Sequence, residues 1–217
     1  MKLTNFCEKI MGETSKVGIS ASKVVALIGT LILIRDSIFY FYTVDLIAIL
    51  LGILGLIIAF VIFDSLEIID FKKLKIPYIW WVLLIIGILL LLLEFVVRSA
   101  FSTFLAGILV ITAAILEILS QKKSYTASKI VALIGVGWLI YESIIYIMSG
   151  NISLIGRAVV GIIFAIILLL TLYDKIDIKI PYSWWVVLLI GFIIFTWVTS
   201  ISGTIIMVAF ILILMAF

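Results

Sequence analysis

The sequence predicts an all-α integral membrane protein with eight transmembrane helices, arranged as two parallel tandem repeats of four helices. Hydrophobic residues make up 66% of the 217 residues and charged residues 12%, about half the charged share that is typical of soluble domains. Apolar runs recur along the whole chain, at lengths close to the ~20 residues that span the hydrocarbon core of a bilayer. These two observations predict the class, and an internal duplication predicts the repeat.

The duplication is visible in two phrases that return in the same order. ASKVVALIG at 21–29 becomes ASKIVALIG at 127–135, 106 residues later. KIPYIWWVLLIIG at 75–87 becomes KIPYSWWVVLLIG at 179–191, 104 residues later. Two long matches at nearly one offset predict a tandem duplication of about 105 residues.

We therefore divide the chain into an N-terminal cytoplasmic or interfacial segment over 1–20, a first repeat over 21–120 and a second over 127–217. Each repeat contains four apolar runs that we expect to be helices. The eight runs lie at 23–43, 46–63, 78–97, 102–119, 129–148, 153–173, 182–199 and 202–217. The turn signals between them are Asp45, residues 98–103, SGN at 149–151 and SISG at 200–203.

A fainter pattern allows a repeating unit smaller than four helices. An acid follows a glycine by seven residues in three of the four odd-numbered runs, at Asp36, Glu94 and Glu142, whereas the fourth run has Val198. The repeat would then be a two-helix hairpin used four times.

The lysines predict the orientation. All twelve lie in the N-terminal segment, at the start of the first run, or in the connections after runs two, four and six. Lysine near helix ends marks the cytoplasmic side of a membrane. We therefore expect a multi-pass protein of the cell membrane with both termini in the cytoplasm. The tryptophan pairs at 80–81 and 184–185 directly follow such connections, as expected of an aromatic belt at the interface.

Charged and tyrosine side chains in the other half of the predicted span form the candidate site. DSIFY at 36–40 matches ESIIY at 142–146, so Asp36 and Glu142 occupy the same position in the two repeats. A carboxylate inside the hydrocarbon core of a membrane costs roughly 2.5 kcal/mol or more unless it is paired. The candidate intramembrane polar cluster comprises Arg35, Asp36, Tyr40, Glu94, Arg98, Glu142, Tyr146 and Arg157.

The spacing of these charges predicts their partners. Glu94 and Arg98 are four residues apart on one helix, which favours a pair. Arg35 points about 100° away from Asp36 on a helix, so we expect these two to pair with other helices. We expect Arg157 to fold back toward Glu142. We also expect each acid to lie within reach of an arginine, Arg35 or Arg157, or of a tyrosine hydroxyl, Tyr40 or Tyr146, and to face the interior near the interface between the repeats.

Small residues predict close helix packing. Ala48, Gly52, Gly55 and Ala59 form a stripe along run two, and Ala158, Gly161 and Ala165 repeat it in run six. Such stripes let helix backbones approach closely in lipid.

Catalytic and cofactor sites have no signature in the sequence. Histidine is absent and Cys7 is the only cysteine, which excludes histidine-ligated metals, serine–histidine or cysteine–histidine catalysis, and an intrachain disulfide. No nucleophile elbow or phosphate-binding glycine loop occurs. We expect no enzymatic activity, no cofactor, no bound metal and no nucleic-acid partner.

Glycine-centred apolar phrases in the even runs, LLGILGLIIAF starting at residue 50 and VVGIIFAIILL starting at residue 159, resemble those of HdeD-type small membrane proteins. This resemblance implies a protein of several helical hairpins that is associated with acid resistance. It assigns no functional residue in this chain.

Two functions fit these observations. One is a scaffold or accessory subunit of a larger membrane assembly, whose partners are the lipid bilayer and other membrane subunits or further copies of the chain. The alternative is a proton or small-cation transporter or channel that uses the intramembrane carboxylates, since charged residues inside a membrane mark functional sites.

Overall fold

The computed structural model describes six parts of the chain, and every structural statement below concerns these parts. They are residues 20–42, 45–66, 78–96, 103–121, 126–172 and 182–215. Within them the structure is all-helical, with eight α-helices, one π-helical turn and no strand. This confirms the predicted all-α class and the eight helical segments.

The helices correspond to the apolar runs of the sequence. The first half of the chain contains α2 (Ala21–Tyr40), α3 (Leu46–Ser65), α4 (Trp80–Val96) and α5 (Phe104–Ser120). The second half contains α6 (Ala127–Met148), α7 (Ile152–Leu172), α8 (Trp184–Ile193), the π-helical turn η2 (Ile194–Val198) and α9 (Ser200–Leu214).

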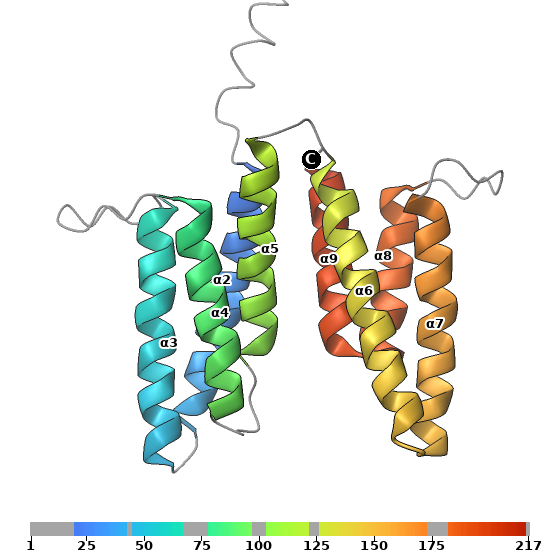
Figure 1. Ribbon diagram of the computed structural model, residues 1–217, viewed down its shortest axis with the longest axis horizontal. Helices are drawn as coiled ribbons and strands as arrows, with labels where there is room; N and C mark the ends of the chain where they lie inside the picture. Colours follow the sequence, from blue (N-terminus) through green and yellow to red (C-terminus); the bar gives the residue numbers. More distant parts are fainter. Residues whose placement is uncertain are drawn as a thin grey trace, which may run out of the picture.

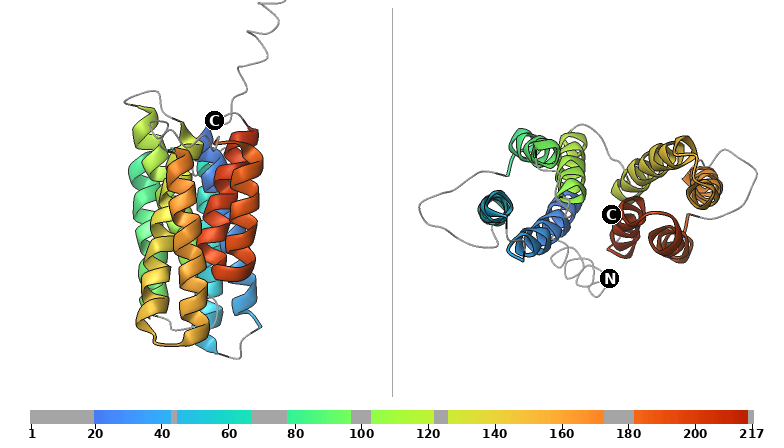
Figure 2. Two further views of the ribbon diagram at one scale, coloured as in Figure 1. Left: turned by 90° about the vertical axis from the view of Figure 1, so that its right-hand side faces the viewer. Right: turned by 90° about the horizontal axis from the view of Figure 1, so that it is seen from below.

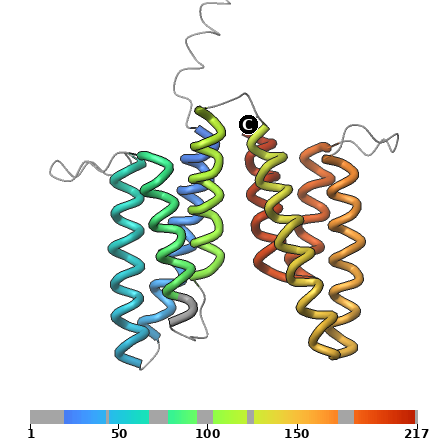
Figure 3. The backbone as a smooth tube through the Cα atoms, in the orientation of Figure 1, coloured from blue at the N-terminus to red at the C-terminus, as the bar shows by residue number. Residues whose placement is uncertain are grey.

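The helices form two groups that lie side by side with their axes roughly parallel (Figure 1, with the chain path in Figure 3). In the first group α2 packs against α3 and α5, and α4 packs against α5. In the second group α6 packs against α7 and α9, and α8 packs against α9. Corresponding helices of the two halves therefore have corresponding neighbours. The groups touch through α2 with α9 and α5 with α6, at the centre of the view from below in Figure 2.

Three of the described helices are long and apolar enough to cross a membrane: α3, α6 and α7. Shorter apolar helical stretches cover Trp80–Leu93, Phe104–Ser120, Trp184–Val198 and Ser200–Leu214. The first residue of α2 and the last residue of α9 lie at the same end of the molecule (Figure 1).

The stripes of small residues are packing surfaces, as predicted. Ala48, Gly52, Gly55 and Ala59 are buried on α3, and Ala158, Gly161 and Ala165 are buried on α7. A Cβ added at Gly52 would lie 2.8 Å from the carbonyl oxygen of Ser37. The backbones of α2 and α3 thus approach too closely at this point for a larger residue.

Turn signals are correct at two connections and wrong at a third. Asp45 caps α3 by accepting the Ile47 amide at 3.1 Å. Gly150 lies in the left-handed region at φ 67° between α6 and α7. The predicted turn SISG at 200–203 is instead the first turn of α9, because Thr199 alone, in extended conformation, connects η2 to α9.

Three other predictions fall outside the described residues. They concern the interfacial segment over 1–20, Arg98 and the side chain of Glu94, and the lysine-rich connections after runs two, four and six. The division of the chain into two repeats stays a prediction.

We predict that Gly52→Ala destabilises the protein. Replacing glycine with alanine inside a helix normally stabilises it by about 1 kcal/mol, but overpacking against the Ser37 carbonyl should cost about 1–3 kcal/mol. The midpoint of thermal unfolding in detergent should therefore fall. Gly137→Ala is the control, because a Cβ there meets no atom within 4 Å, and its midpoint should not fall. A Gly52→Ala midpoint equal to that of the wild type would contradict the prediction.

Candidate functional site

Asp36 lies in the interior of the first half and is paired with its neighbour in sequence. Its residue exposure is 4%. The Nε and Nη2 atoms of Arg35 both donate to its Oδ1 atom, at 2.9 and 2.7 Å. The expectation that these two side chains pair with other helices is therefore wrong. The long arginine side chain lies against its neighbour on α2 and is 62% exposed.

The second carboxylate oxygen of Asp36 has no hydrogen-bond partner among the described residues, and the same is true of the hydroxyl of Ser37. Both atoms are buried. A buried polar group without a partner costs about 1–3 kcal/mol, so the pair marks a place where packing overrides hydrogen bonding or where a further polar group could be accommodated.

Glu142 is half-buried and bonds to a residue of its own half. The Oγ1 atom of Thr199 donates to its Oε2 atom at 2.5 Å, and Thr199 also hydrogen-bonds the hydroxyl of Ser202. Since Thr199 is the single residue between η2 and α9, this bond ties α6 to that junction. The predicted pairing of Glu142 with Arg157 is wrong, as is a location between the two halves.

The serines that follow the two acids occupy equivalent places. Ser37 and Ser143 are both buried at 0% exposure, and neither hydroxyl has a hydrogen-bond partner within the described chain. Each faces a glycine on the next helix, because a Cβ built at Gly55 or Gly161 would collide with the serine hydroxyl. The repeated serine in DSIFY and ESIIY was the signal for this contact, which the sequence analysis did not use.

The remaining members of the predicted cluster are dispersed. Tyr40 is buried at 3% exposure, Tyr146 is half-buried and Arg157 is exposed. The members that the structure describes are therefore not gathered into one polar pocket. It forms two separate polar positions, at Asp36 and at Glu142, and leaves Arg157 elsewhere.

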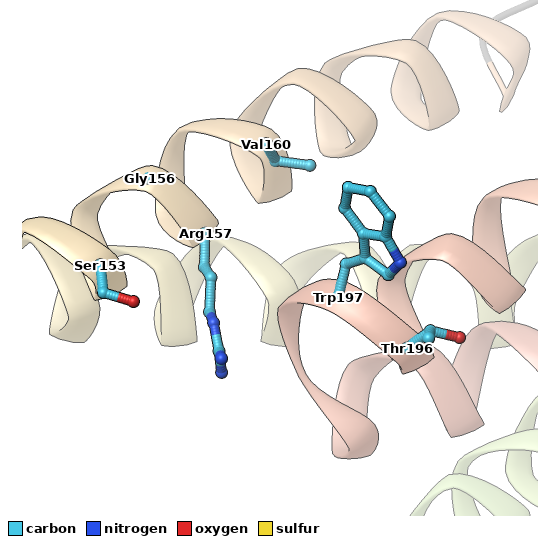
Figure 4. Close-up of a pocket in the computed structure, with 6 residues that line it drawn as sticks. All are labelled: Ser153, Gly156, Arg157, Val160, Thr196 and Trp197. Atoms are coloured by element: carbon cyan, nitrogen blue, oxygen red, sulfur yellow. The ribbon is translucent and has the colours of Figure 1, made fainter.

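Arg157 lines an open groove of about 430 Å³ between α7 and η2 (Figure 4). Arg157 and Val160 extend from α7 on one side, and Trp197 lies across from them on η2. The other lining residues are Ser153, Gly156 and Thr196. Arg157 makes no ion pair with any residue that the structure describes.

A polar cluster at the opposite helix ends was missed by the sequence analysis. Ser22 donates to the Oε2 atom of Glu117 at 2.5 Å and hydrogen-bonds the Tyr78 hydroxyl at 2.9 Å. The Nζ atom of Lys23 lies 5.6 Å from the centre of the Tyr78 ring. This cluster joins α2, α5 and the residue that precedes α4 by two positions.

The second half repeats part of this cluster. The Nζ atom of Lys129 lies 5.9 Å from the centre of the Tyr182 ring. The duplicated phrases contain this signal. Both copies of the ASK phrase keep Ser-Lys, and both copies of the KIPY phrase keep the tyrosine. The helix α9 contains no acidic residue, so among the described residues only the first half adds a carboxylate to this cluster.

No group of three or more cysteine, aspartate or glutamate side chains gathers into a metal-binding cluster in the described part of the chain. Comparison of the chain with protein-family models, with curated proteins and with solved structures finds no match. The resemblance to HdeD-type proteins stays a prediction, since none of these comparisons supports or contradicts it.

We predict that Glu142 and Thr199 stabilise the fold jointly. In a double-mutant cycle of Glu142→Ala and Thr199→Val, either single change removes the same hydrogen bond. The double mutant should therefore lose less unfolding free energy than the sum of the two single mutants, by about 1 kcal/mol or more. Denaturation in detergent measures these energies. Thr204→Val replaces Thr199→Val as the control, since its hydroxyl bonds its own helix at Ser200, and this pair should add. Additivity of the first pair would refute the bond.

Proposed function

We propose that the chain is a multi-pass protein of the cell membrane with eight transmembrane helices in two parallel repeats. The matching neighbours of corresponding helices support the duplication. The common end of α2 and α9 supports termini on one side, and the lysines make that side the cytoplasm. The shorter helices, such as the 15 residues of α9, reach only about 22 Å at ~1.5 Å per residue, so flanking residues would complete their crossing.

Cysteine labelling tests this topology. In a Cys7→Ser background, Asn151→Cys should react with a membrane-impermeant maleimide applied to intact cells, and Lys123→Cys should react only after permeabilisation. Residue 123 precedes α6 in the sequence and Asn151 follows it. The reverse pattern would overturn the orientation, and equal reaction from outside would overturn the crossing by α6.

The proposed role is that of a non-enzymatic scaffold or accessory subunit. The observation that carries it is that most buried hydroxyl groups of the described residues already have hydrogen-bond partners. Those of Thr30, Ser65, Thr112 and Thr171 all donate to carbonyl oxygens of their own helices. Asp36 and Glu142 bond to separate local partners. A polar solute would therefore find few free groups to replace its water.

The lateral surfaces supply the area that a scaffold needs. The most exposed large apolar side chains on α3 are at least half as accessible as in an extended chain, and they lie on the side away from α2. They are Leu46, Ile47, Leu50, Ile57 and Phe60. Lipid and neighbouring membrane subunits, or a second copy, are the partners that such a surface fits.

The alternative function, conduction of protons or a small cation, rests on one observation. The free Oδ2 atom of Asp36 and the free hydroxyl of Ser37 are adjacent in sequence, and both are buried. Intramembrane acids of this kind mark ion pathways in other membrane proteins. Asp36 would then carry the proton or ligate the cation.

Flux and purification measurements separate the two functions. For a scaffold we expect no proton or sodium flux above that of empty vesicles in proteoliposomes, and a partner at fixed stoichiometry after purification in native lipid discs. Flux that Asp36→Asn abolishes and Glu142→Gln retains would favour the alternative. A chain that purifies without any stoichiometric partner and without self-association would contradict the scaffold role.

A further inference from the structure

The groove beside Arg157 exists because helices of unequal length meet there. The α6–α7 turn lies well beyond the η2–α9 junction (Figure 1), so α7 begins past the end of the α8–α9 hairpin. The junction closes with a π-helical hydrogen bond from the Thr199 amide to the Ile194 carbonyl at 2.9 Å. Single π-helical turns are rare and occur often at functional sites.

The two halves of the chain differ at every position of this groove. Counted at the offset of 106 residues on α7 and 104 residues on η2, each of the six lining residues corresponds to leucine or isoleucine in the first half. Ser153, Gly156, Arg157, Val160, Thr196 and Trp197 correspond to Ile47, Leu50, Leu51, Leu54, Leu92 and Leu93. A wholly aliphatic surface in one half is thus a cationic, hydroxyl-bearing groove in the other.

The groove offers hydrogen-bond donors to an anion. Arg157 presents five N–H groups in a planar fork that matches the oxygens of a phosphate. The hydroxyl of Ser153 can add one donor. The Thr196 hydroxyl already donates to the Phe192 carbonyl at 2.8 Å, so its oxygen can only accept. This set of groups is suited to a phosphate monoester or diester.

The helices that form the groove carry further exposed apolar side chains. Ile163 and Ile166 are exposed on α7, and Phe192 and Phe195 are exposed on α8 and η2. Arg157 lies five residues after the start of α7, or about 8 Å at ~1.5 Å per residue. An arginine at this depth reaches the level of lipid head groups, and tryptophan favours the same level. The neighbourhood therefore fits acyl chains attached to the bound phosphate.

We propose that this groove binds the phosphate of an anionic phospholipid in the membrane leaflet opposite the lysine-bearing helix ends. The inference rests on the proposed membrane setting. Arg157 holds the phosphate, Trp197 and Val160 contact the glycerol and the upper acyl chain, and Ser153 supplies a further donor. The first half has no such site, because leucine replaces the arginine.

Native mass spectrometry of the detergent-solubilised full chain tests the site. After incubation with phosphatidylglycerol, the wild type should retain one lipid molecule more strongly than Arg157→Gln, by about tenfold in apparent affinity. Arg157→Lys should be intermediate, because it keeps the charge and loses the planar fork. Lys123→Gln removes a cation from the connection that precedes α6 and should bind as the wild type does. Equal unfolding midpoints of the Arg157 variants and the wild type will show that the fold is retained.

Two further arms identify the ligand. Phosphatidylcholine should bind more weakly than phosphatidylglycerol, and inorganic phosphate at the same concentration should not displace the lipid. Retention of phosphatidylglycerol by Arg157→Gln at the wild-type level would overturn the site. Equal binding of phosphatidylcholine would overturn the charge selectivity, and displacement by inorganic phosphate would make the groove a site for a free anion. The cysteine-labelling pattern of α6 tests the membrane setting separately, so failure of one is distinguishable from failure of the other.

Discussion

Close approach of helix backbones is the constraint on which the rest of this structure depends. In the proposed membrane setting no hydrophobic force draws helices together, and small residues let van der Waals contact do so. The serines at 37 and 143 face Gly55 and Gly161 across the first helix pair of each half. This contact fixes how α2 lies on α3 and α6 on α7. The cost is a buried hydroxyl without a partner in each half, which shows that packing takes precedence over hydrogen bonding there.

The same constraint determines how the neighbouring acids are neutralised. Because each serine faces the adjacent helix, the acid before it is turned about 100° around the helix axis and cannot share that contact. Asp36 then depends on Arg35, whose side chain is long enough to return along its own helix. Glu142 follows Tyr141, which stands where the first half has Arg35. It therefore bonds instead to Thr199, the residue that precedes α9. The two equivalent acids thus have different partners, because different residues lie within hydrogen-bond distance of each.

Apolar runs and helix caps made the helices predictable from the sequence. The hydrogen-bond partners of the polar side chains were not predictable from it. Asp45 at a cap position and Gly150 in the left-handed region are local signals, and both mark the turns that they predict. SISG carries turn residues too, yet Thr199 caps the helix one residue earlier and the serines continue it. The bond from Thr199 to Glu142 joins residues 57 apart in the chain. It depends on where a one-residue connection places Thr199, and no spacing in the sequence encodes that.

Comparison of the two halves separates structural residues from candidates for function. Positions that pack helices are kept: Gly55 and Gly161 correspond, as do Ala59 and Ala165, and Ser65 and Thr171 make the same bond to their own helix. If drift alone separated the halves, differences on exposed surfaces would exchange one apolar residue for another, since lipid tolerates any of them and disfavours charge. At the groove, Arg157 of the second half corresponds to Leu51 of the first, a difference that lipid disfavours. An exchange that lipid opposes and packing does not require is best explained by a ligand that compensates the charge.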